Sequence, residues 1–209
     1  IAFAYRRKLL NFETFDLAAW EKWEDLVLGA DANNVVPGKF VAFSSPQISA
    51  VSPDGLPAMM PKDYLPMFNS FNVVAVIQLN QVAYNPSGFT DNGIAHHSLW
   101  FPDGTTPPPE IVDRFITLCD TIFADSPPES QIAVHCDAGL GRAGTCIALY
   151  LMYLYGWTAS IAIAWIRICR PGSVCGVQQY FLEEQQHDMW LRGNHLTNIK
   201  EPAFQRRSE

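Results

Sequence analysis

Short apolar runs and helix-like patterns alternate along the chain. Runs of branched or aromatic residues bounded by turn residues predict strands, and they cover 35–46, 72–80, 93–101 and 131–135. We interpret the first run as one strand ended by Pro46. Longer apolar patterns predict helices, and they cover 64–71, 107–123, 146–155, 158–168 and 177–192. This alternation predicts an α/β fold with a central sheet flanked by helices.

The segment 12–29 is amphipathic. Leu17 and Trp20 lie at helical spacing with acidic residues around them, which predicts a helix that packs on the core. In an alternative interpretation, the acidic residues Glu21 and Glu24 face a basic substrate. The chain ends in KEPAFQRRSE, which we expect to be a solvated tail.

The stretch HCDAGLGRAG (135–144) lies between a predicted strand and a predicted helix. QIAVH precedes it, and the proline-free run that follows it is expected to end at Gly156. N–H groups at a helix N-terminus lack partners within the helix and carry partial positive charge. The glycines allow successive N–H groups to converge on one anion. We therefore expect this loop to bind phosphate or sulfate.

Cys136 and Arg142 carry the candidate chemistry of this loop. They are six positions apart (142 − 136 = 6), which is enough chain to surround one tetrahedral anion. A thiol at a helix N-terminus beside a cation loses its proton readily, so we expect Cys136 to be a nucleophilic thiolate. Arg142 offers a fork of donors to two phosphate oxygens. His135 is expected to orient the loop and support the thiolate without transferring protons.

Two further loops supply candidates for proton transfer and hydrolysis. Asp103 lies in WFPDGTTP, 33 residues before the cysteine (136 − 103 = 33). A carboxylic acid on a mobile loop can protonate a leaving oxygen, although Pro-Asp-Gly is also an ordinary turn. Gln178 and Gln179 follow the Pro-Gly turn of RPGSVCGVQQYFL. An amide there can hold an attacking water, or the pair can simply open a helix.

Composition and charge narrow the function classes. The 209 residues are 48% hydrophobic and 17% charged, which indicates an ordered globule. A net charge of −7 argues against nucleic acids and acidic membranes as main partners and is compatible with basic peptides. The five cysteines have no metal-ligand spacing, so we expect a reducing compartment and no metal or cofactor. The apolar run 143–155 is too short to span a membrane.

Five long stretches occur in order between about residue 11 and residue 195: NFETFDL, VPGKFVAFSSP, GFTDNGIAHHSLWFPDGTTP, IAVHCDAGLGRAGT and AWIRICRPGSVCGVQQYFL. Together they resemble the cell division cycle fourteen phosphatases, a cysteine-based dual-specificity family of mitotic exit. The resemblance implies the cysteine-dependent protein tyrosine phosphatase fold and two tandem domains, of which the second is catalytic. It implies that 1–34 is a helical connector from a missing or reduced first domain, 35–195 the catalytic domain and 196–209 a C-terminal tail.

The resemblance also implies what the site residues do. Cys136 is the nucleophile, Asp103 is the acid and then the base, and the region of Gln178 serves hydrolysis, with His135 and Gln179 in support. The implied phosphate-binding residues are Asp137, Ala138, Gly139, Leu140, Gly141 and Arg142.

The implied substrates are phosphoproteins in the cytoplasm and nucleus. Phosphoserine is preferred to phosphothreonine, each followed by proline and, a little downstream, by a basic residue; phosphotyrosine is also hydrolysed. Glu21 and Glu24 resemble part of the groove that receives the basic residue. No nucleic acid or membrane partner is implied.

Two residues depart from the family pattern. Ala143 stands where most relatives have a threonine whose hydroxyl hydrogen-bonds the departing thiolate. Hydrolysis of a phosphocysteine is therefore expected to be slower by about tenfold to a hundredfold, unless Thr145 compensates. Asp137 replaces a usual lysine and makes the loop less cationic.

Two other function classes stay open. A phosphopeptide-binding module with weak or lost turnover is compatible with Ala143, but the intact nucleophile, arginine and acid argue against it. A phosphoinositide phosphatase needs lysines in the loop to meet additional phosphates, and this chain has Asp137 and Leu140 there.

Overall fold

A computed structural model describes residues 31–51, 55, 58–82 and 84–193, with a few single positions before them. Most of the helix predicted at 12–29, including Glu21 and Glu24, lies outside the described residues. The tail predicted at 196–209 also lies outside them.

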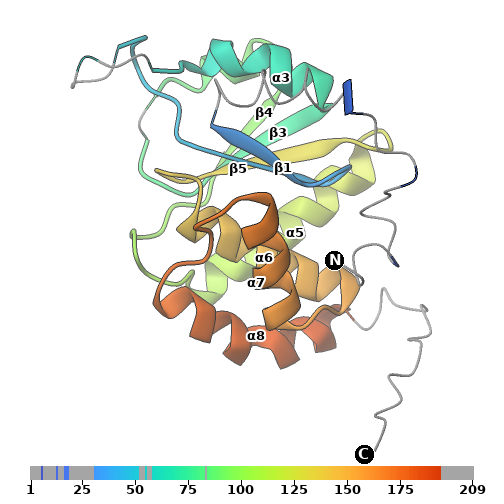
Figure 1. The fold of residues 1–209 in the computed structure, drawn as a ribbon. Coiled ribbons are helices and arrows are strands. Elements are labelled where there is room, and N and C mark those ends of the chain that lie inside the picture. Colours follow the sequence, from blue (N-terminus) through green and yellow to red (C-terminus); the bar gives the residue numbers. More distant parts are fainter. Residues whose placement is uncertain are drawn as a thin grey trace, which may run out of the picture.

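Within the described part of the chain, five strands form one mixed sheet in the order β1-β2-β5-β3-β4 (Figure 1). β1 and β2 pair antiparallel, and all other neighbours pair parallel. The strands are β1 (Ala32–Val36), β2 (Phe40–Phe43), β3 (Val73–Gln78), β4 (Ala95–Ser98) and β5 (Gln131–His135).

β1 and β2 form a hairpin where the sequence analysis predicted one strand over 35–46. Pro37 has no N–H to donate to a neighbouring strand, and Gly38 takes a φ of 72°, a conformation that favours glycine. The prediction of a single strand is therefore wrong, because the Pro-Gly pair turns the chain. β1 begins at Ala32, so the domain boundary predicted between 34 and 35 falls inside a strand.

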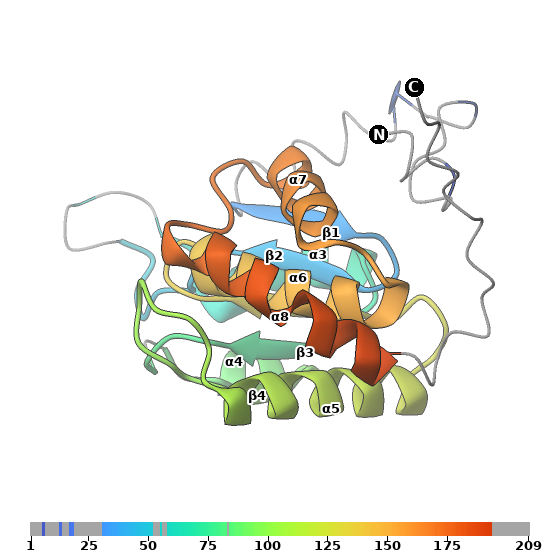
Figure 2. The same ribbon diagram turned by 90° about the horizontal axis from the view of Figure 1, so that it is seen from below.

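Helices cover both faces of the sheet (Figures 1 and 2). The larger layer consists of α5 (Pro109–Asp125), α6 (Gly141–Tyr155), α7 (Ala159–Cys169) and α8 (Val177–Gly193). The smaller layer consists of η1 (Pro61–Tyr64), α3 (Leu65–Ser70) and α4 (Ser87–Thr90). The helices predicted within the described residues are confirmed with small shifts at their ends, except that α6 begins five residues earlier than predicted. Among the described helices, none is long and apolar enough to cross a bilayer.

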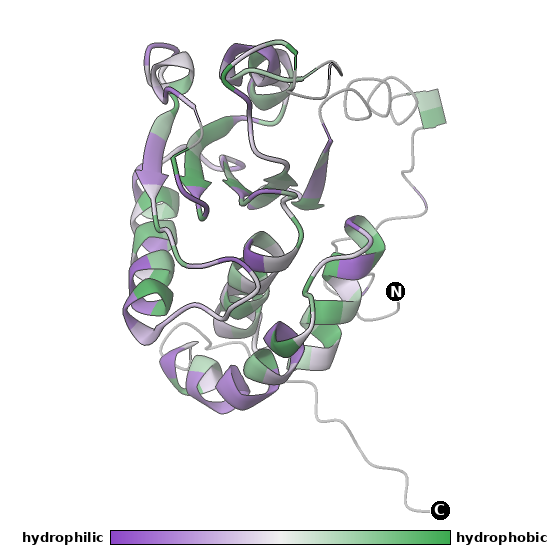
Figure 3. Cartoon of the chain, turned by 90° about the vertical axis from the view of Figure 1, so that its left-hand side faces the viewer, coloured by the Kyte–Doolittle hydropathy of each residue, from purple (hydrophilic) through white to green (hydrophobic). Residues whose placement is uncertain are grey.

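The sheet separates two hydrophobic clusters. Along β2, Phe40 and Ala42 join the cluster beneath α5–α8, whereas Val41 and Phe43 join the cluster beneath α3 and α4. Successive side chains of a strand point to opposite faces, so a continuous apolar run supplies both layers. In Figure 3 the strands change from green in the middle of the sheet to purple at its edges. The middle strands are therefore the apolar part of the sheet, whereas the edge strands β1 and β4 carry polar side chains.

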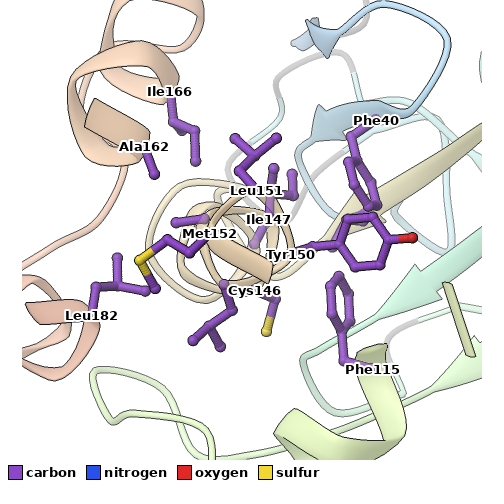
Figure 4. Packing of buried hydrophobic residues seen from close by; sticks show 14 of the residues in the cluster. Phe40, Phe115, Cys146, Ile147, Tyr150, Leu151, Met152, Ala162, Ile166 and Leu182 are labelled. Atoms are coloured by element: carbon purple, nitrogen blue, oxygen red, sulfur yellow. The ribbon is translucent and has the colours of Figure 1, made fainter. Parts of the chain in front are cut away.

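Helix α6 runs through the centre of the larger layer. Figure 4 shows it surrounded by Phe40 of β2, Phe115 of α5, Ile166 of α7 and Leu182 of α8. A helix that is apolar on all sides is stable only when buried in this way. As predicted, it ends at Gly156, which takes the left-handed conformation. This packing holds the N-terminus of α6 beside the end of β5, where the loop 136–140 lies.

Candidate active site

Arg170, just after α7, holds the loop between β5 and α6 from outside. Its Nη2 donates to the carbonyl of Ala138 at 2.8 Å, and its Nε donates to the carbonyl of Gly139 at 2.9 Å. The remaining guanidinium hydrogens go to Asp31 (3.1 and 3.2 Å) and to Asn33 (2.7 Å), at the start of the sheet. The arginine is 3% exposed, and every one of its five N–H donors has a partner.

The carbonyls on either side of this pair are also held from outside. The carbonyl of Asp137 accepts from the N–H of Ser45 at 2.8 Å, and that of Leu140 accepts from the N–H of Val174 at 3.3 Å. In a trans peptide the C=O and the following N–H point in opposite directions. The amides of 138–141 therefore point to the other side of the loop, where they are free to donate to an anion.

Gly139 is required by this arrangement. Its φ is 65°, and a Cβ there would lie 2.0 Å from the carbonyl oxygen of Phe43. The loop thus passes so close to β2 that any side chain at this position would push it away.

Arg142, at the start of α6, is 1% exposed. Its Nη1 donates to the carbonyls of Leu79 and Phe101, at 3.3 and 3.0 Å. Its Nη2 lies 2.6 Å from a carboxylate oxygen of Asp137 and 3.0 Å from one of Asp103. Its Nε is buried without a partner. A buried N–H that makes no hydrogen bond is costly, and Nε together with Nη2 forms the fork that grips phosphate, so this donor indicates an anion site.

A pocket of about 470 Å³ opens onto this arginine. Its lining combines the arginine with two acids, two amides and an apolar rim: Arg142, Asp103, Asp137, Asn80, Gln81, Val82, Trp100 and Pro102. Among the described residues, no group of three or more side chains is placed to hold a metal ion. The site therefore offers hydrogen-bond donors and one buried cation to an anionic ligand.

Cys136 begins the loop and is almost completely buried. All five cysteines are free. Burial raises the pKa of the Cys119 and Cys146 thiols well above the usual range, and it raises the pKa of Cys169 to about 11. Those three thiols stay protonated and unreactive. Of the other two, Cys175 is exposed and lies outside this loop, so Cys136 is the candidate nucleophile.

His135 ends β5 and lies wholly inside the protein. Its Nδ1 is 3.2 Å from the carbonyl oxygen of Cys136, and its Nε2 is 2.7 Å from the hydroxyl of Tyr84. Burial lowers the pKa of His135 to about 3, so the ring is neutral near pH 7. Because a carbonyl only accepts, Nδ1 carries the hydrogen and Nε2 accepts from Tyr84. The Tyr84 oxygen then accepts from Nε2 of His96, 2.9 Å away, and the chain of bonds orients the loop without a mobile proton.

Asp103 projects from a loop that is anchored on both sides. Its side chain is 75% exposed. Before it, the carbonyl of Phe101 accepts from Arg142 at 3.0 Å, and after it, the carbonyl of Thr105 accepts from Nε2 of Gln178 at 3.0 Å. The carboxyl group is therefore held at the pocket while staying open to solvent.

The structure brings one of the two predicted glutamines to the site. Gln178 is buried, its Oε1 accepts from the N–H of Cys175 at 3.0 Å, and the same oxygen lies 3.0 Å from where a Cβ on Gly141 would stand. Gln178 thus touches the loop and ties it to the loop that carries the acid. Gln179 instead accepts from Arg167 of α7 at 3.3 Å.

Thr145 does not replace the hydroxyl that Ala143 lacks. Ala143 is buried in the core. The hydroxyl of Thr145 donates to the carbonyl of Gly141, one helical turn earlier, at 2.7 Å. Its single hydrogen is thus used within the helix, so the compensation considered from the sequence has no donor to act through.

Sequence reasoning missed Arg170, Asn80 and Tyr84. Asn80 donates to the carboxylate of Asp137 at 2.7 Å, across 57 positions of sequence. The partners of Tyr84 and Arg170 in the loop are 51 and 31 positions away. The available signals were weak: Asn80 ends an apolar run, and Arg170 precedes a Pro-Gly turn.

Comparison with known proteins agrees with this geometry. A family model described as a polymorphic toxin system DSP-PTPase phosphatase matches residues 55–155. Human dual specificity protein phosphatase CDC14A is 48% identical over 184 residues, which are 88% of this chain and 30% of the human protein. CDC14AB of Danio rerio is 43% identical over 205 residues, which are 98% of this chain and 32% of that protein. The chain belongs to the CDC14 family.

The chain spans less than a third of the length of these two CDC14 relatives. Among solved structures, PTPMT1 superimposes with a TM-score of 0.62 at 18% identity, covering 78% of this chain and 99% of that one. At this identity the likeness concerns the fold alone, and it confirms the predicted cysteine-dependent protein tyrosine phosphatase fold.

Proposed function

We propose that this CDC14 family chain is a cysteine-based dual-specificity protein phosphatase whose catalytic domain begins with β1 at Ala32 and includes α8. The observation that carries the proposal is Arg142, which is buried below an open pocket with one donor unpartnered. The amides of 138–141 are free to donate beside it, and Cys136 begins the same loop. Family membership supports a role in cell-cycle control, and we infer that it acts in the cytoplasm and nucleus.

In the first step, the Cys136 thiolate attacks the phosphorus of a phosphomonoester. The S–P bond forms while the bond from phosphorus to the ester oxygen breaks, and Asp103 delivers its proton to the leaving oxygen. Arg142 and the loop amides stabilise the charge on the equatorial oxygens in the transition state. The step needs no metal, because the charge is met by N–H donors and a guanidinium group.

In the second step, water attacks the phosphocysteine. The Asp103 carboxylate takes a proton from that water as the S–P bond breaks. Phosphate is released and the Cys136 thiolate is regenerated. The free hydrogen of the Gln178 amide is close enough to the loop to orient the water. Because Ala143 offers no hydroxyl to the departing sulfur, we expect this step to limit turnover.

Rapid-mixing hydrolysis of p-nitrophenyl phosphate tests the proposal. We expect a burst of one nitrophenolate per active site followed by slow turnover, and no product from Cys136→Ser. Ala143→Thr restores a donor worth roughly 1.5–3 kcal/mol, so its slow phase should be about tenfold to a hundredfold faster. Fast linear turnover by the wild-type chain would contradict the argument about Ala143. Absence of product, with phosphopeptide still bound, would contradict the phosphatase proposal itself.

We further propose that the substrates are phosphoserine or phosphothreonine sites followed by proline and a downstream basic residue. The pocket rim supports the proline, because Val82 and Trp100 are 72% and 45% exposed there and offer an apolar contact to its ring. A pair of phosphopeptides that differ only in proline or alanine after the phosphoserine tests this. We expect a higher kcat/KM for the proline peptide and loss of that advantage in Trp100→Ala. Equal values for the two peptides would contradict it.

A further inference from the structure

The carboxylate of Asp137 occupies a donor that a bound phosphate needs. Its Oδ2 lies 2.6 Å from Nη2 of Arg142. The second carboxylate at that nitrogen, from Asp103, lies 3.0 Å away, and only Nε is left without a partner. A phosphate bound through the fork takes one hydrogen from Nε and one from Nη2. One of the two carboxylates must therefore give up its contact when substrate binds.

Asp137 cannot simply leave the pocket. Its other oxygen, Oδ1, accepts from Nδ2 of Asn80 at 2.7 Å, and Asn80 is itself buried and bonded to the hydroxyl of Ser45 at 3.2 Å. The Asp137 side chain is nevertheless 66% exposed at the pocket mouth. Asp103, by contrast, is on a loop and has no second side-chain partner among the described residues. Once a phosphate is bound, the Asp137 carboxylate thus remains beside it and faces the solvent.

This placement sets the charge balance of the occupied pocket. Its lining holds two carboxylates and a single cation. A phosphate dianion next to a fixed carboxylate is disfavoured by charge repulsion, less so where water screens the pair. A cation supplied by the substrate at the same point would relieve the repulsion. A further anion of the substrate would increase it.

We propose that Asp137 is a specificity-determining residue for phosphopeptides that carry lysine or arginine immediately before the phosphorylated residue, on the side opposite the proline. The same carboxylate disfavours substrates with a second phosphate or an acidic side chain at that place. This inference rests on the phosphatase activity proposed above and names the class of peptide that its pocket accepts.

The test compares three phosphoserine-proline peptides that are identical except for lysine, glutamine or glutamate immediately before the phosphoserine. For the wild-type chain we expect kcat/KM to fall in that order, by about two- to fivefold at each step, as for an ion pair that is partly open to water. Asp137→Asn keeps the size and the hydrogen-bonding oxygen but removes the charge. In this variant the three values should lie within about twofold of one another.

Asp125→Asn is the matched control, because it removes the same charge from an exposed position at the end of α5. It should leave the wild-type order intact, which separates a local effect from the general attraction of a negatively charged chain for basic peptides. Binding of the same peptides to the Cys136→Ser chain gives the ranking without turnover. If that ranking appears while the wild-type chain releases no phosphate, the proposed activity fails and the specificity stands. A ranking that is flat in the wild-type chain, or unchanged by Asp137→Asn, would overturn the inference.

Discussion

Two buried arginines contact the same loop and serve it in different ways. Arg142 and Arg170 are 1% and 3% exposed, so both side chains are shielded from solvent. Arg170 directs its five N–H donors to three side-chain oxygens and two loop carbonyls. Arg142 directs four donors to protein atoms and leaves Nε without a partner.

The difference separates a group that shapes a site from a group that waits for a ligand. A fully satisfied buried charge is stable as it stands and rigidifies what it touches. A buried donor without a partner costs free energy that only a ligand can recover. The two arginines have nearly the same solvent exposure, and they differ in whether every N–H donor has a hydrogen-bond partner.

The largest effect is expected from Arg142→Lys. Lysine keeps the positive charge but has no planar fork, so it cannot bind two phosphate oxygens in parallel. We expect kcat/KM for p-nitrophenyl phosphate to fall by about 10²–10³-fold, as when one donor to transition-state charge is removed. Arg114→Lys, on the exposed face of α5, should leave it unchanged. A loss below about tenfold would mean that the unpartnered Nε is not a phosphate donor.

A smaller effect, on stability as well as activity, is expected from Arg170→Met. Methionine fills similar space but leaves two loop carbonyls and the carboxylate of Asp31 without their donor. We expect the free energy of unfolding in urea to fall by about 3–5 kcal/mol. The surviving folded protein should bind inorganic phosphate more weakly, because the loop amides are no longer held in place.

Asp31→Asn refines this second comparison. It removes a charge from a carboxylate that is itself 66% exposed but keeps an oxygen that can accept from Arg170. This variant should lower the free energy of unfolding much less than Arg170→Met does. It should also leave the binding of inorganic phosphate, measured as inhibition of hydrolysis, nearly unchanged. If Arg170→Met left both unfolding and phosphate inhibition at the wild-type values, the contrast between the two arginines would collapse.

The smallest effect near pH 7 concerns His135, the third basic side chain buried at this loop, and this effect grows as the pH falls. Burial lowers the pKa of His135 to about 3, below the value of about 6.5 for an unfolded histidine. The unfolded chain therefore binds this proton first. Above about pH 6.5, His135 adds no pH dependence to the free energy of unfolding. Between about pH 6.5 and about pH 3, it lowers the free energy of unfolding by about 1.4 kcal/mol for each unit by which the pH falls.

His135→Gln checks this sign, because an amide can donate to the Cys136 carbonyl and accept from Tyr84 without titrating. Unfolding free energies measured from pH 7 to pH 4 should fall less steeply for the variant than for the wild-type chain. Parallel curves would show that the ring is not held neutral in the folded protein.

Much of the site could be predicted because it is local in sequence. Strand, glycine loop and helix follow one another within 131–155, and the apolar pattern of each is visible without any distant partner. A Cys and an Arg six positions apart in a glycine loop at a helix N-terminus are well placed to face a common anion, so Cys136 and Arg142 are the candidates that the sequence indicates. Asp103 is the candidate acid because it lies in a turn between a predicted strand and a predicted helix.

The errors came from elements whose form depends on neighbours. The run 35–46 has strand-like composition throughout, and only the pairing of its two halves in the sheet makes Pro37 and Gly38 a turn. Gln178 and Gln179 are adjacent and identical in type, yet the direction of α8 sends one to the loop and the other to Arg167.

The sequence by itself determined the α/β order, and it indicated the candidate anion-binding loop and its candidate nucleophile, because periodicity and short-range spacing carry that information. The tertiary structure alone decided which buried donor stays free, which carbonyls are held from behind, and that Asp137 lies against Arg142. Those facts depend on contacts between residues far apart in the chain and on burial. Burial decides both the charge of His135 and the cost of an unpaired N–H, and no local pattern of residues encodes it.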